Sequence, residues 1–440
     1  MTLEHYLEHW ATATPQKVAV VTPVGQMTYK ELWMLVGQRV RDFRTAGIGW
    51  GRIVPLRTQQ NASFLADYCA LHVVGGVPMP LEHDMPADKF NLLSQHYGQL
   101  TAPQGTADVL FTTGTTGVSK GVYISHKALM ANAENLIDAH GYCQDLTFIV
   151  CGPLNHIGSL SKVWPVFVTG ATLYVLEGMK DIGAFFHALD YPARLMASFL
   201  VPASLRMLLL LGARQIGEYA QKLDFIETGA APMVQADMEK LCALLPTTRL
   251  FNTYASTETG IICTHNYNDG NSCSPRCVGR PMRHSGVTVT NEGSVVCTGA
   301  TLMTGYAGDD ERTAQVMTNG SVCTSDSGYI DDEGRLYLTG RTDDVINVGG
   351  YKVAPSEVEA AAMTDQSVKD CICIGVPSPL TGSALKLLVV PNDGCMLDKR
   401  KLAQHIAKRI ERHKVPLLYE QVDSVRRNVN GKLERKYYFT

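Results

Sequence analysis

A short segment rich in glycine and hydroxyl side chains is the first part of this 440-residue sequence that could do chemistry. The run TTGTTGVSKG, residues 112–121, follows the apolar stretch DVLFT and carries three glycines, five hydroxyl groups and one lysine. Glycine lets the backbone approach an anion closely, and successive N–H groups, hydroxyls and an ammonium group can surround phosphate oxygens. The spacing differs from the P-loop pattern, so we expect another kind of phosphate loop between a strand and a helix-forming segment. The residues expected to contact phosphate are Thr112, Thr113, Gly114, Thr115, Thr116, Gly117 and Lys120.

Further motifs precede and follow this loop in a fixed order. They are MTYKEL at 27–32, PLNHIG at 153–158, GAAP at 229–232, FNTYASTETG at 251–260, TSDSGYIDDEGRLYLTGR at 324–341 and NGK at 430–432. The series resembles the motifs of the adenylate-forming superfamily of acyl-CoA synthetases, adenylation domains and luciferases, and it extends along nearly the whole chain. The resemblance implies that ATP activates a small carboxylic acid as its acyl-adenylate, with release of pyrophosphate, before the acyl group passes to a thiol.

The implied reaction must bring two anions together. At about 4 Å, like unit charges repel by ~4 kcal/mol at an effective dielectric constant of about 20. Cations and oriented N–H groups have to offset this repulsion in the transition state. By resemblance, Glu258 holds Mg²⁺, Thr257 hydrogen-bonds the α-phosphate, and Lys432 bridges the carboxylate and the α-phosphate. A carboxylate oxygen suits Mg²⁺, and a long flexible ammonium side chain suits a bridging role.

The remaining motif residues are expected to bind the nucleoside. By resemblance, Asp326 accepts hydrogen bonds from both ribose hydroxyls and Arg341 contacts the ribose. Tyr254 is expected to stack on adenine. The edge of the base is expected to be read by Asn252 or by the backbone of Gly229, Ala230 and Ala231.

A segment near residue 343 resembles the family's hinge. It predicts an adenylation domain, residues 1–341, and a mobile C-terminal domain, residues 342–440. Asp343 is the expected pivot about which the small domain exchanges the Lys432 face for a thiol-accepting face. Gly350 and Lys352 lie where the second face forms, and glycine would let a pantetheine thiol pass close to the backbone.

The resemblance leaves the thiol acceptor open. CoA is the expected acceptor, and the phosphopantetheine of a carrier protein is the alternative. A third reading is a non-catalytic nucleotide-binding relative, against which the intact Glu258, Asp326, Arg341 and Lys432 argue.

The acid itself is less well specified. His156 resembles the family's gate beside the acyl carboxylate. Amino-acid-activating relatives carry an aspartate in the stretch that here reads Ser159–Lys162 without an acid, so an α-amino acid is disfavoured. The stretch 196–210 resembles o-succinylbenzoate–CoA ligases, in which case Arg206 could pair with a second carboxylate; an exposed helix arginine is the alternative.

The elements that must position these residues follow an α/β pattern. Helices alternate with buried strands up to about residue 285, which predicts mostly parallel sheets. Short strands and tight turns then predict a small β-rich subdomain. The polar and glycine-rich stretch 341–350 predicts a linker. Beyond it, a helix near 356–363, strands at 368–375 and 386–390 and a helix near 398–413 predict a small α+β domain.

Composition limits the classes of function. The net charge of −3 gives no support for nucleic-acid or membrane binding, and no apolar run is long enough to span a bilayer, so we expect a cytoplasmic protein. The chain has 12 cysteines, and Cys273 and Cys277 form a CxxxC pattern with Cys263 and Cys297 nearby. The spacing matches no strong zinc motif, so a metal site and buried reduced cysteines both remain open.

Overall fold

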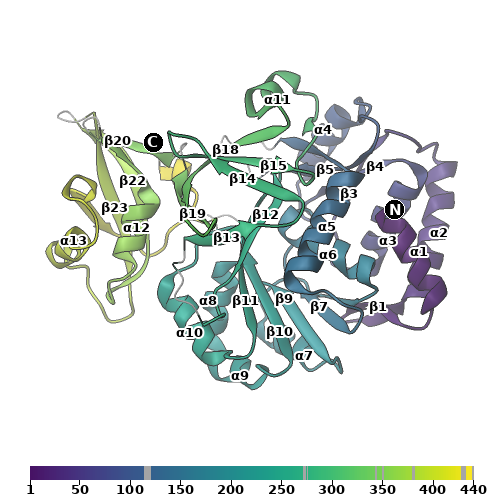
Figure 1. Cartoon of the computed structure of the whole chain (residues 1–440), viewed down its shortest axis with the longest axis horizontal. Coiled ribbons are helices and arrows are strands. Elements are labelled where there is room, and N and C mark those ends of the chain that lie inside the picture. The colour runs from purple at the N-terminus through teal and green to yellow at the C-terminus, as the bar shows by residue number, and fades with distance from the viewer. Residues whose placement is uncertain are drawn as a thin grey trace.

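In the computed structural model, the described residues are 1–112, 120–270, 274, 276–341, 344–348, 351–378, 382–427 and 433–438. Figure 1 shows an elongated molecule with the N-terminal helices at one end and the C-terminal part of the chain at the other. Of the residues assigned above by sequence, Thr113, Gly114, Thr115, Thr116, Gly117, Cys273, Asp343, Gly350 and Lys432 lie outside the described residues.

The first hundred residues form helices and short strands at one end of the molecule. The sequence TYKE forms the predicted capping box, in which the Thr28 hydroxyl accepts from the Glu31 N–H at 3.2 Å and the Glu31 carboxylate accepts from the Thr28 N–H at 2.8 Å. The elements are α1 (Leu3–Ala13), β1 (Val18–Thr22), β2 (Gly25–Thr28), α2 (Tyr29–Thr45), β3 (Ile53–Arg57), α3 (Ala62–Val74), β4 (Val77–Leu81) and α4 (Ala87–Gly98).

A parallel sheet covered by helices on both faces forms the centre. Strands run parallel in the order β11-β10-β9-β7-β8-β1. Apolar side chains of α5 and α6 pack on one face, and those of α7 to α10 pack in a separate core on the other. The bounds are α5 (His126–His140), β7 (Leu146–Val150), α6 (Ile157–Thr169), β8 (Thr172–Val175), α7 (Ile182–Leu189), β9 (Leu195–Phe199), α8 (Pro202–Leu211), α9 (Ala213–Glu218), β10 (Leu223–Gly229), α10 (Gln235–Leu244) and β11 (Arg249–Ser256).

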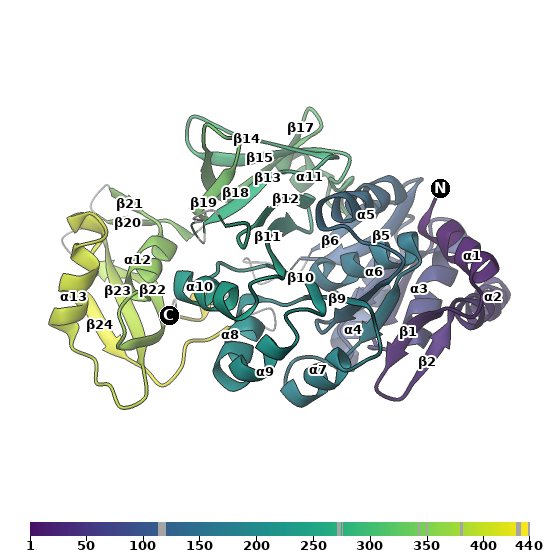
Figure 2. The ribbon, with the colours of Figure 1, turned by 60° about the horizontal axis from the view of Figure 1, so that its bottom comes forward.

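The same sheet continues as antiparallel strands beyond β11. Among the described residues it has 14 strands, so the expected parallel pairing holds only for its central part, and the expected β-rich subdomain is its extension. Figure 2 shows these strands rising above the parallel part. The bounds are β12 (Gly260–Asn266), β13 (Cys277–Pro281), β14 (Ser285–Val289), β15 (Ser294–Gly299), α11 (Asp310–Val316), β17 (Met317–Thr318), β18 (Ser321–Ile330) and β19 (Leu336–Arg341).

The glycine- and threonine-rich loop joins two antiparallel strands. Strands β5 (Thr106–Phe111) and β6 (Gly121–Ser125) pair from Thr106 opposite Ser125 to Phe111 opposite Gly121, and β16 (Gly305–Tyr306) adds to β6. The helix expected after the loop is present as α5, but a strand that was not expected precedes it. The apolar, β-prone run Val122–Ile124 forms a buried strand first, and the helix begins only at His126.

The C-terminal residues form a small α+β unit with its own apolar core, as predicted. Strands β22, β23 and β24 make a three-stranded sheet beside α12 and α13. The second helix ends at Ala407 rather than near 413, and a 3-10 turn, Arg412–Lys414, follows it. The bounds are β20 (Ile346–Val348), β21 (Tyr351–Val353), α12 (Pro355–Ala362), β22 (Val368–Ser378), β23 (Gly382–Pro391), α13 (Lys399–Ala407) and β24 (Leu418–Gln421), with a second 3-10 turn at Arg435–Tyr438.

Within the described part of the chain, no helix has both the length and the apolar character needed to cross a bilayer.

Candidate active site

A cavity of about 620 Å³ opens where the parallel strands end. Cys151 and Glu177, which follow β7 and β8, line it together with Phe199 and Gly229, the last residues of β9 and β10. Ligands of open α/β sheets bind outside the carboxyl ends of the strands, because side chains and loops from several strands meet there. The position and the volume fit a nucleotide with a small organic acid.

The cavity gathers predicted residues from motifs spread over more than half of the chain. Among the described residues, its lining includes Thr112, Lys120, His156, Gly229, Ala230, Thr257, Glu258, Asp326 and Arg341. Three other predicted residues, Ala231, Asn252 and Tyr254, are described but do not line it. Lys352 belongs to β21, and its side chain is not described.

Asp326 lines this cavity and contacts two other residues that the sequence assigned to nucleoside binding. It lies directly opposite Arg341 in the β18–β19 ladder, and the Arg341 Nε lies 4.0 Å from Asp326 Oδ1. The hydroxyl of Tyr254 donates to Asp326 Oδ2 at 2.7 Å. Burial and the Asp326 charge raise the pKa of Tyr254, so the phenol stays protonated and orients the carboxylate. Stacking of Tyr254 on adenine stays a prediction.

Glu258 lies in a second polar group that sequence reasoning did not find. The hydroxyl of Tyr306 donates to Glu258 Oε1 at 3.1 Å. Lys120 and Arg312 lie over the Tyr306 ring, 5.6 and 5.9 Å from its centroid. A carboxylate held by a phenol can share Mg²⁺ with phosphate oxygens, because Mg²⁺ commonly takes one or two carboxylates and completes its shell with phosphate and water.

The GAAP loop is tightly constrained. A Cβ atom on Gly229 would lie 2.7 Å from the Thr253 carbonyl oxygen of the neighbouring strand, so glycine is required there. Ala230 adopts a left-handed conformation, φ 70°, which costs energy for a residue with a Cβ atom. The Asn252 amide donates to the Cys277 carbonyl at 2.8 Å and holds β13 rather than facing the cavity.

Another part of the cavity lining contains a buried ion pair that the sequence did not reveal as such. Lys162 Nζ, from α6, lies 2.7 Å from Glu227 Oε1, from β10, and both residues line the cavity. Lys162 also lies over the ring of Phe199, 4.9 Å from its centroid. Burial lowers the pKa of Lys162 while Glu227 opposes that shift. In the sequence, the signal for this pair was a charged residue within an apolar helix and a charged residue within a largely apolar strand.

His156 and Arg206 differ in where their side chains lie. His156 caps the start of α6 and lines the cavity, with its Nε2 3.4 Å from the Asn155 amide nitrogen. Arg206 does not line the cavity, and its Nε donates to Asp237 at 3.0 Å. The structure therefore gives no support to a role for Arg206 in binding a second carboxylate.

The cysteines named above do not form a metal site among the described residues. Cys263, Cys277 and Cys297 are buried, and burial raises the pKa of the Cys263 thiol and raises that of Cys297 to about 12. Protonated thiols are poor metal ligands.

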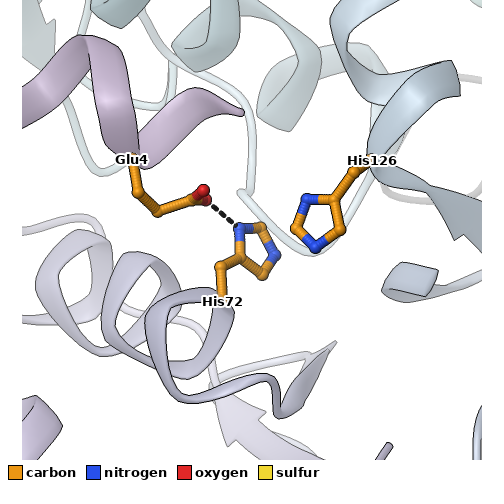
Figure 3. Close-up of side chains that lie close together, drawn as sticks. All are labelled: Glu4, His72 and His126. Atoms are coloured by element: carbon orange, nitrogen blue, oxygen red, sulfur yellow. Dashed lines mark hydrogen bonds and ion pairs between the residues drawn. The ribbon is translucent and has the colours of Figure 1, made fainter. Parts of the chain in front are cut away.

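A further titratable cluster lies away from the cavity, where α1, α3 and α5 meet. Figure 3 shows Glu4, His72 and His126 pointing toward one another. His72 Nδ1 lies 2.6 Å from Glu4, and its Nε2 lies 3.2 Å from Asp108 of β5. Burial acts to lower the pKa of His72, but the two carboxylates outweigh it and raise that pKa to about 10. An imidazolium that donates from both nitrogens cannot ligate a metal, so this cluster is a structural ion network.

Comparison with known proteins shows which family has this fold and these motifs. A model of the AMP-binding enzyme family matches residues 92–307, and a model of the AMP-binding enzyme C-terminal domain matches residues 357–432. The chain is 25% identical over 500 aligned residues to the indoleacetate–CoA ligase of Aromatoleum aromaticum, covering 99% of this chain and 97% of the relative. It is 26% identical over 367 residues to a 2-succinylbenzoate–CoA ligase of Staphylococcus epidermidis, covering 81% of this chain and 72% of the relative.

Solved structures show the same fold. The crystal structure of ATP-bound MatB from Rhodopseudomonas palustris superposes with a TM-score of 0.89 at 22% identity, covering 100% of this chain and 99% of that one. The fold and the two family models define the class as adenylate-forming enzymes with a small C-terminal domain. The two models together span about two thirds of the sequence, and the chain belongs to the AMP-binding enzyme family.

Proposed function

We propose that this protein is an AMP-forming acid–CoA ligase. ATP and a small carboxylic acid react in the cavity to give an acyl-adenylate and pyrophosphate, and CoA then takes the acyl group. The observation that carries the proposal is the convergence of Asp326, Glu258, Thr257 and Lys120 on one cavity at the carboxyl ends of the parallel strands.

The residues have distinct tasks in the first step. An oxygen of the substrate carboxylate forms a bond to the α-phosphorus, and the bond from that phosphorus to pyrophosphate breaks. Asp326, oriented by Tyr254 and Arg341, fixes the ribose. Glu258 would hold Mg²⁺, which supplies positive charge to the phosphates when bound. Lys120 and Thr257 are placed to offset the charge that builds up on the phosphate oxygens.

The far end of the chain is proposed to supply the last cation. The described residues on either side of NGK are well anchored: Arg427 pairs with Leu433 in an isolated bridge and binds Asp370, and Arg435 binds Glu359 at 2.6 Å. This anchoring supports presentation of Lys432 to the acyl carboxylate. We further propose the domain boundary after Arg341, because every described residue that lines the cavity precedes residue 342.

In the second step, the thiol sulfur bonds to the acyl carbonyl carbon, and the bond from that carbon to the AMP oxygen breaks. We propose CoA as the thiol, because the relatives named above that match most of this chain are CoA ligases. Gly350 and Lys352 are the proposed contacts of the pantetheine arm.

The test is acid-dependent exchange of labelled pyrophosphate into ATP, followed by addition of CoA. We expect exchange with the matching acid and a CoA thioester as product. Lys432→Ala should lower the exchange rate by about 10²–10³ without loss of ATP binding, measured by calorimetry. Unchanged exchange in Lys432→Ala would refute its role. Exchange without any CoA product, rescued by a holo carrier protein, would assign the acceptor to a carrier protein instead.

A further inference from the structure

The part of the cavity lined by Lys162 and Glu227, which we take as the acid end under the proposed function, is polar. A plain hydrocarbon tail on the acid does not explain this polarity. Ser161, Lys162 and Glu227 all line the cavity, and each is at most 2% exposed. The hydroxyl of Ser161 is buried and has no hydrogen-bond partner among the described residues. Buried polar groups are nearly always hydrogen-bonded in folded proteins, so an unpaired buried hydroxyl in the lining of a cavity calls for a partner.

The position of Lys162 along α6 bears on the length of the acid. The helix begins at Ile157, directly after His156, the residue that the sequence assigns to the gate beside the reacting carboxylate, and Lys162 lies six positions beyond His156. At about 1.5 Å per residue, that separation corresponds to about 9 Å along the helix axis. An acid with about one aromatic ring and a short linker between its carboxylate and its distal group matches this axial separation.

Charge decides what this distal group is. Lys162 is matched by Glu227 at 2.7 Å, so the pair is already neutral as a whole. A second carboxylate would add an unbalanced buried charge, and an ammonium group would meet Lys162 itself. The remaining lysine protons and the Ser161 hydroxyl can donate, while Glu227 Oε2 is a buried acceptor without a hydrogen-bond partner among the described residues. Their complement is an uncharged group with an oxygen acceptor, and a hydroxyl group can serve both the donors and the acceptor.

We propose that the acid activated by this enzyme carries a neutral oxygen, a hydroxyl or carbonyl, at its distal end, and that Lys162 and Ser161 bind that oxygen while Glu227 holds Lys162 in place. This inference rests on the proposed function and names its substrate class. Lys162 is in this view the specificity-determining residue. A site built to hydrogen-bond a substrate oxygen discriminates strongly against the analogue that lacks it.

The experiment compares matched acids in pyrophosphate exchange with the full-length enzyme. The acids are phenylacetate, para-hydroxyphenylacetate, para-acetylphenylacetate and para-carboxyphenylacetate, with the phenylpropanoate series as a second length. We expect kcat/KM for the hydroxyl or acetyl acid to exceed that for the unsubstituted acid by at least about tenfold in one series. Equal or better activity with the unsubstituted or the carboxylated acid would overturn the proposal.

Variants test whether Lys162 is the cause. Lys162→Met combined with Glu227→Gln removes both charges together, and Lys386→Met combined with Glu420→Gln does the same at a pair in the C-terminal sheet, where the two charged atoms lie 2.5 Å apart. In the Lys162→Met, Glu227→Gln variant, the ratio of kcat/KM for the oxygen-bearing acid to that for the unsubstituted acid should fall to about one. In the Lys386→Met, Glu420→Gln variant, this ratio should stay unchanged. A full preference in the first variant would overturn the role of Lys162, and if that variant does not fold, the acid panel decides alone. Absence of exchange with these acids and with a wider panel of aliphatic and aryl acids would instead contradict the proposed function itself.

Discussion

At the scale of single residues, the nucleotide end of the cavity depends on how one carboxylate is held. Asp326 receives the Tyr254 hydroxyl on one oxygen and faces Arg341 with the other. Two rigid strands carry these partners, so the carboxylate is oriented before ribose arrives. Such preorganisation lowers the entropy cost of binding.

Tyr254→Phe tests this arrangement. Loss of a hydrogen bond to a charged group should raise KM for ATP by about tenfold or more, with a smaller effect on KM for the acid. Tyr219→Phe is the matched control, because the Tyr219 hydroxyl donates to Asp190 at the same distance of 2.7 Å on the surface. An unchanged KM for ATP in Tyr254→Phe would contradict the role assigned to the phenol.

Motif residues could be predicted from the sequence because the motifs that contain them resemble, in order, those of a known superfamily. Their partners could not. Tyr306 meets Glu258 from 48 positions away, and Lys162 meets Glu227 from 65 positions away. Pairings of this kind are set by strand order and helix packing, and no local pattern encodes them.

At the scale of elements, an ion network ties the N-terminal helix to the strand that leads into the phosphate loop. His72 of α3 joins Glu4 of α1 to Asp108 of β5, and Tyr68 donates to the second oxygen of Asp108 at 3.0 Å. Burial opposes ionisation of Glu4, but His72 and local hydrogen bonds outweigh it and lower the pKa of Glu4 to about 2.

These pKa shifts predict how stability depends on pH. Because its pKa is raised on folding, His72 contributes to the free energy of unfolding in full below about pH 6.5, and this contribution is lost as the pH rises toward about 10. Because its pKa is lowered on folding, Glu4 contributes to the free energy of unfolding in full above about pH 4.5, and this contribution is lost as the pH falls toward about 2. His72→Gln should cost ~3–5 kcal/mol near pH 6, because two carboxylates lose their buried partner.

The measurement is the melting temperature of wild type and His72→Gln from pH 6 to pH 10. The gap between them should narrow as pH rises. Exposed His187 in α7 provides the control His187→Gln, for which no such gap is expected. A gap that stays constant across this range would contradict the ionised state of His72.

Element boundaries were predictable where a local signal exists, as at the Thr28 capping box. The strand β6 was not, because only pairing with β5 and β16 distinguishes Val122–Ile124 from the start of the following helix. The same holds for β4, whose two prolines obscure a strand that pairs with β3.

At the scale of the whole molecule, the C-terminal unit has its own core and supplies no described residue to the cavity lining. A contact between the two parts is the donation from Arg206 to the Lys369 carbonyl at 3.4 Å. Another is the donation from the Ser356 hydroxyl to the Thr339 carbonyl at 3.2 Å. A small unit with its own core suits the proposed exchange of one face for another about Asp343.

Asp343→Pro tests the proposed pivot. Proline fixes one backbone dihedral, so rotation should be hindered while each fixed state can still react. We expect pyrophosphate exchange within about threefold of wild type and a loss of thioester formation of about tenfold or more. Asp393→Pro is the control, because Asp393 occupies the second position of the Asn392–Cys395 turn, where proline is tolerated. Equal loss of both half-reactions would contradict a pivot at Asp343.

The central claim is that acid and ATP meet as an acyl-adenylate in this cavity. The most direct measurement follows oxygen from a substrate acid labelled with ¹⁸O in its carboxylate through a complete turnover with ATP, Mg²⁺ and CoA. The account predicts that each AMP gains one labelled oxygen on its phosphorus and that the thioester keeps the other. Label in inorganic phosphate with ADP as the product, or AMP without label, would contradict it.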